Sequence, residues 1–105
     1  MKQRTIKQTK DLKRAPSSLY QAFLALKKPD EVRQFLSDLC TPAELEAMVD
    51  RWWIVTLLDE GHSYRDINSK TGISVTTIGR VARHLNMGAG GYSIPLNRKK
   101  SSKQL

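Results

Sequence analysis

A cluster of basic and hydroxyl side chains between positions 64 and 87 of this 105-residue chain could recognise a polyanion. Arginine offers a planar fork of donors that suits guanine or phosphate, and threonine offers a hydroxyl together with a methyl group. We predict that the earlier basic residues hold backbone phosphates and that the later hydroxyl and guanidinium groups reach base edges. The candidate DNA-contacting residues are Arg65, Lys70, Ser74, Val75, Thr76, Thr77, Arg80 and Arg83.

Two short helices are expected to position these side chains. Ser63 and Ser74 can each cap a helix, because a serine oxygen accepts backbone N–H groups, and Gly72 supplies the break between them. Apolar residues at the spacing of a helix-turn-helix would lock the pair together: Ile67, Ile73, Ile78 and Val81. We therefore predict a helix-turn-helix at about 64–87. An ordinary helical hairpin with a solvated polar face is the alternative.

Charge is distributed unevenly along the chain, whose net charge is +8. Residues 63–86 carry four bases and one acid, a net +3, and follow residues 41–60, which carry one base and five acids, a net −4. Residues 1–14 contribute +5 and residues 98–105 contribute +4. We predict a basic flexible arm at 1–16, a helical domain at 17–97 and a basic disordered tail at 98–105.

The remaining apolar pattern is helical, which predicts an all-α fold. Apolar stripes follow Ser17 and Ser18 and again follow Pro29, and a longer helix should run from Pro42 to Glu60 and end at Gly61. This longer helix is apolar on two faces and includes Trp52 and Trp53, which we assign to a core or an interface. A chain this short cannot cover both faces itself, so the pattern favours an intertwined homodimer.

The sequence argues against several other classes of protein. No apolar run approaches the ~18 residues that span a bilayer, which predicts a cytoplasmic protein without a membrane partner. One cysteine and two histidines make a zinc site implausible. We find no phosphate-binding loop, catalytic triad or acid pair, so an enzyme is not expected.

Several separated motifs resemble the Trp repressor family, and particularly its Trp-repressor-like YerC/YecD branch. The motifs lie in order between about 19 and 98 and comprise Phe35 to Ala47, Ser63 to Ile67, Thr71–Gly72 and Gly88 to Tyr92. The resemblance implies a homodimer that binds double-stranded operator DNA through two helix-turn-helix motifs. It also implies a transcriptional regulator, and most simply a repressor, acting in the cytoplasm at the nucleoid.

The resemblance also implies an effector pocket, because tryptophan is the corepressor of Trp repressor. The matching residues are Thr41, Arg51 and Arg80, and the two guanidinium groups suit a carboxylate. The chain departs from the repressor at Val81 and His84, where the repressor has glycine and serine. Because this bulk would occupy the space of the indole, we expect no cofactor and no tryptophan binding. An unidentified small-molecule effector stays open.

Two alternative functions also stay open. The chain could be the DNA-binding module of a mobile-element protein, or a basic RNA-binding or assembly protein that uses its two tails. Deleting the tails distinguishes the last alternative, since it should abolish tail-driven binding but weaken a sequence-specific regulator only modestly.

Overall fold

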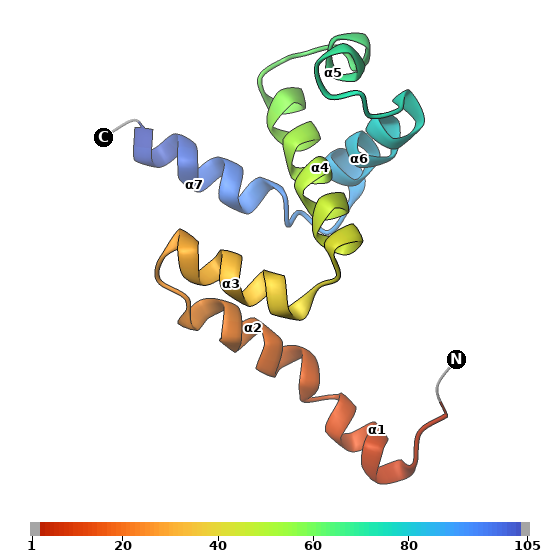
Figure 1. Cartoon of the computed structure of the whole chain (residues 1–105), viewed down its shortest axis with the longest axis vertical. Helices are drawn as coiled ribbons and strands as arrows, with labels where there is room; N and C mark the ends of the chain where they lie inside the picture. Colours follow the sequence, from red (N-terminus) through yellow and green to blue (C-terminus); the bar gives the residue numbers. More distant parts are fainter. Residues whose placement is uncertain (1–2, 104–105) are drawn as a thin grey trace. The chain divides into compact units, whose positions relative to one another are not determined.

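A computed structural model describes residues 3–103, with side chains described to position 100, and these residues form helices without a strand (Figure 1). The all-α prediction is confirmed. The chain divides into two compact units, 1–41 and 42–105. The helices are α1 (Ile6–Leu12), α2 (Ala15–Ala25), α3 (Pro29–Leu39), α4 (Pro42–Asp59), α5 (Tyr64–Thr71), α6 (Val75–Met87) and α7 (Ser93–Lys103).

The first unit consists of α1, α2 and α3, and none of its described residues is buried. α3 begins at Pro29 as predicted, and the Glu31 carboxylate accepts the backbone N–H of Lys27 at 2.7 Å. Phe23 of α2 and Phe35 of α3 meet edge to face, with ring centroids 5.2 Å apart. This aromatic contact links the two helices.

α1 lies within the segment for which the sequence predicts a flexible arm. A capping box explains this helix, because Thr5 Oγ1 accepts the Gln8 N–H at 3.1 Å and Gln8 Oε1 accepts the Thr5 N–H at 2.7 Å. α2 also begins at Ala15, before the predicted serine caps, with a proline in its first turn. The first two residues of the predicted arm lie outside the described residues.

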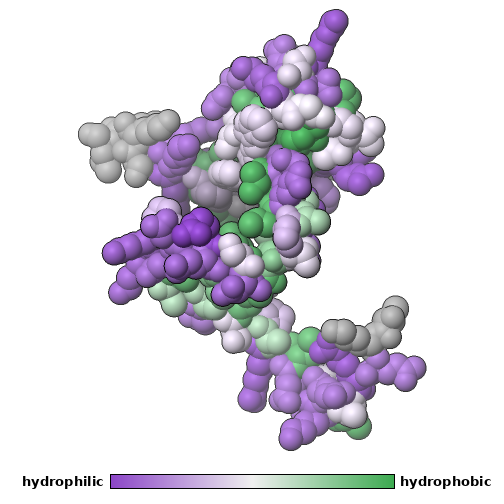
Figure 2. Space-filling model, viewed as in Figure 1, coloured by the Kyte–Doolittle hydropathy of each residue, from purple (hydrophilic) through white to green (hydrophobic). Residues whose placement is uncertain are grey.

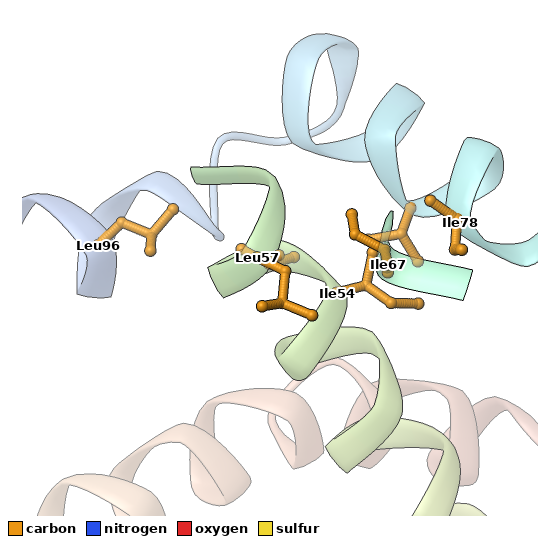
Figure 3. Close-up of a cluster of buried hydrophobic side chains, with 7 residues drawn as sticks. Ile54, Leu57, Ile67, Ile78 and Leu96 are labelled. Atoms are coloured by element: carbon orange, nitrogen blue, oxygen red, sulfur yellow. The ribbon is translucent and has the colours of Figure 1, made fainter. Parts of the chain in front are cut away.

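The second unit is built around one apolar core. α4 packs on α5 and α6, and α5 packs on α6. Figure 3 shows side chains from all four helices of the unit converging on this core. Its buried members are Ile54, Val55, Leu57, Ile67, Ile78, Val81 and Leu96. α4 ends where predicted, since Gly61 has a φ of 91° and donates its N–H to Leu58 O at 3.0 Å.

α7 lies partly where the sequence predicts a disordered tail. The chain turns after α6, as expected, with Gly90 at a φ of 85°, but it then forms a helix that continues to Lys103. Leu96 anchors this helix in the core, and Lys100 Nζ lies 2.8 Å from Asp59 Oδ1 of α4. The last two residues of the predicted tail lie outside the described residues. In the described part of the chain, no helix is long and apolar enough to cross a membrane.

Candidate nucleic-acid interface and adjoining cleft

Hydrogen bonds fix the turn between α5 and α6. Ser63 caps α5 by accepting the Asp66 N–H at 3.1 Å, and α5 ends at Gly72, which has a φ of 74°. The Asn68 side-chain amide donates to Ile73 O at 2.8 Å, and the Ile73 N–H donates to Thr71 Oγ1 at 3.1 Å. Side chains of α5 therefore hold the backbone of the turn, so that α6 starts from a fixed position.

α6 begins at the serine cap that the sequence predicts. Ser74 Oγ accepts the Thr77 N–H at 3.2 Å and donates to Thr77 Oγ1 at 3.0 Å. Thr77 is half-buried, and its hydroxyl is already engaged by this cap. The predicted base contact of Thr77 stays a prediction, but this geometry gives the residue a role in holding the start of α6.

α6 has one buried face and one polar face. Ile78 and Val81 are each at most 4% exposed and pack against α4 and α5, as predicted, and Ala82 is 5% exposed beside them. Thr76, Arg80 and Arg83 are exposed on the remaining surface. The polar face is therefore available to a ligand, while the opposite face anchors the helix in the core.

Three other candidate residues at this motif are also exposed. Val75 is 52% exposed at the first position of α6, although it is apolar. Arg65 and Lys70 are exposed on α5. The second unit thus presents both the predicted base-reading residues of α6 and the predicted phosphate-binding residues of α5.

A cleft of about 1120 Å³ lies beside α6 in the second unit. Four of the five predicted effector residues line it: Arg51, Arg80, Val81 and His84. The fifth, Thr41, belongs to the first unit. The side chain of Val81 is 4% exposed and packs in the core, so its bulk is fixed against the cleft by neighbouring side chains.

The cleft contains charges of both signs. Glu46 and Asp50 of α4 line it together with the two arginines, and among the described residues neither guanidinium forms an ion pair with these acids. The turn from Gly88 to Tyr92 forms another part of the lining. We did not predict these residues as lining, although the glycine-rich sequence directly after α6 is a signal for such a turn. A ligand in the cleft would therefore meet charges of both signs.

The structure thus defines a small all-helical protein with two short helices joined at a capped turn, the connectivity of a helix-turn-helix. A family model described as Trp repressor protein matches residues 16–100, and the chain belongs to this family. The family comprises regulators rather than enzymes.

Individual relatives agree with this assignment. Uncharacterized protein YerC of Bacillus subtilis (strain 168) is 38% identical over 84 residues, which cover 80% of this chain and 81% of YerC. The crystal structure of a TrpR-like protein from Eubacterium eligens superposes with a TM-score of 0.78 at 40% identity, covering 83% of this chain and 90% of that one. A Staphylococcus aureus structure named for the Trp repressor has a TM-score of 0.76 at 34% identity, covering 82% and 86%. The predicted family is confirmed.

Proposed function

We propose that this chain is a sequence-specific DNA-binding transcriptional regulator that represses by occupying a double-stranded operator. The observation that carries the proposal is the exposed face of α6, with Thr76, Arg80 and Arg83 held on a helix whose other face is locked in the core. Capped helices of this kind enter the major groove with their first residues directed at base edges. Arg65 and Lys70 of α5 bind the flanking phosphates.

The regulator acts as a homodimer. Each unit exposes more large apolar side chains than is usual for a soluble monomer. Figure 2 shows such hydrophobic patches on the face in view. In the first unit they include Tyr20, Phe23, Leu24, Val32 and Leu39, and on α4 they include Met48, Val49, Trp52 and Trp53. A second copy of the chain covers these surfaces and brings two reading helices to one DNA site.

The cleft beside α6 is the candidate effector site. Arg80 both lines the cleft and lies on the exposed side of α6, so an anionic ligand there would compete with DNA for the same guanidinium or change its direction. Tryptophan is not the effector in this proposal, because Val81 and His84 occupy space beside the arginines. DNA binding proceeds without tryptophan or responds to a different small ligand.

Selection of bound fragments from random double-stranded DNA tests the proposed function. We expect a two-fold symmetric motif with half-sites about 10 base pairs apart, the spacing that suits two helix-turn-helix motifs of a dimer. Recovery of fragments without a shared motif would contradict sequence-specific recognition. Selection from single-stranded RNA serves as the control, and a stronger enrichment there would favour the alternative RNA-binding function.

A further inference from the structure

Gly79 occupies an unusual position in the middle of α6. It lies three residues after Thr76 and four residues before Arg83, so the three residues share one side of the helix. Both neighbours on this side are exposed, and Gly79 itself is half-buried. Glycine destabilises a helix interior relative to alanine, because it loses more conformational freedom on folding. A glycine here therefore needs a reason that outweighs this loss.

The internal structure of the chain does not require a glycine at this position. The three glycines with positive φ are Gly61, Gly72 and Gly90, and Gly79 is not among them. A Cβ atom on Gly79 would meet only the Tyr64 ring, at an ordinary contact distance of 3.8 Å. By contrast, a Cβ on Gly88 would clash with the carbonyl oxygen of His84. Alanine would thus fit at position 79 without strain.

The lengths of the side chains around Gly79 indicate how deeply α6 must enter the major groove. Val75 and Thr76, one turn earlier, are short, so they reach base edges only if the helix backbone lies deep in the groove. A helix with side chains is about 10–12 Å wide and the major groove is about 12 Å wide, so atoms on the facing side decide the depth of insertion. Arg80 and Arg83 are long and reach DNA from a shallower position.

We propose that Gly79 sets the depth at which α6 enters the major groove and is therefore a specificity-determining residue. This proposal rests on the proposed DNA-binding function. The absent side chain lets the backbone of α6 approach the bases closely, so that the hydroxyl of Thr76 and the methyl groups of Val75 make contact. An added methyl group at position 79 holds the helix away from the bases, while the phosphate contacts persist.

The substitution Gly79→Ala tests this inference, because stability and recognition should change in opposite directions. We expect the melting temperature to stay equal or rise, and the ratio of selected-operator to scrambled-duplex affinity to fall about tenfold, within the range typical of removing one direct interaction with a base. Thermal denaturation measures the first quantity and fluorescence anisotropy the second. Ser37→Ala is the control, because it also replaces a weaker helix former by alanine inside a helix, at an exposed position of α3 away from the motif.

Two results would overturn the inference while leaving the proposed function intact. One is a Gly79→Ala variant with an unchanged ratio of operator to scrambled affinity. The other is an equal loss of affinity on both duplexes, which would mean that the methyl group disturbs phosphate docking alone. Gly79→Ser gives a second measurement of the same ratio. A lower ratio of operator to scrambled affinity in both variants supports the inference. Failure of the proposed function is separate, since the unmodified protein would then prefer no duplex.

Discussion

The two units of the chain differ in how many of their apolar side chains are buried. Among the described residues of the second unit, eight hydrophobic residues are buried, all between Ile54 and Leu96. The first unit buries none of its described residues, although α2 and α3 carry clear apolar stripes. A hydrophobic core supplies most of the favourable free energy of folding. The comparison teaches that the second unit carries its own core, whereas a second copy covers the first unit only in the proposed dimer.

The largest expected effect is on the free energy of unfolding, when one apolar side chain is truncated to alanine in each unit. Ile78→Ala should lower the free energy of unfolding by about 2–5 kcal/mol, because it leaves a cavity in the core of the second unit. Ile6→Ala, at a residue of α1 that is 81% exposed, is the control and should cost much less. Urea denaturation of both variants at equal protein concentration measures the difference. Equal losses would contradict the contrast between the units.

Dimerisation should depend on the exposed stripe of the first unit. We expect sedimentation at micromolar concentration to show a species of twice 11.9 kDa. Phe23→Ala combined with Leu24→Ala should shift this species towards the monomer and make the melting temperature depend more steeply on protein concentration. A folded monomer of the unmodified protein at micromolar concentration would disprove the dimer.

Basic residues of the first unit should contribute affinity without sequence preference. Replacing Lys7, Lys10 and Lys13 by alanine should weaken binding to all duplexes alike, because lysines of this kind contact phosphates only. The slope of log affinity against log salt concentration should become shallower by about 0.9 for each phosphate that is no longer neutralised. Anisotropy titrations at several salt concentrations check both effects. A change in preference between duplexes would contradict this role.

The smallest expected signal concerns tryptophan. Titration calorimetry of the unmodified protein should show no binding of L-tryptophan up to millimolar concentration. Val81→Gly combined with His84→Ser should create measurable affinity, because the two substitutions clear space beside Arg51 and Arg80. Thermal denaturation must first show that this variant folds, since Val81 belongs to the core. Millimolar or tighter binding by the unmodified protein, with a gain in operator affinity, would restore tryptophan as corepressor.

Local signals made much of the second unit predictable. Ser63, Gly72 and Ser74 each act on groups within four residues, so the ends of α5 and the start of α6 follow from the sequence directly. The apolar spacing of α6 likewise predicted which side chains are buried.

The features that the sequence did not reveal depend on more distant or subtler contacts. α7 is tied to α4 by Lys100 and Asp59, which are 41 positions apart. The acidic lining of the cleft arises because α4 and the turn after α6 meet in space. Gly79 was missed because a glycine inside a helical pattern has no obvious role until the space around it is known.

The most direct test of the central claim is the effect of Thr76→Ala on sequence preference. The claim is that the exposed face of α6 reads DNA sequence while the remaining basic residues supply general affinity. Fluorescence anisotropy with the selected operator and a scrambled duplex should show a loss of preference of about 1–3 kcal/mol for Thr76→Ala and none for the lysine variant. If Thr76→Ala and the lysine variant weaken both duplexes equally, direct reading by α6 is wrong.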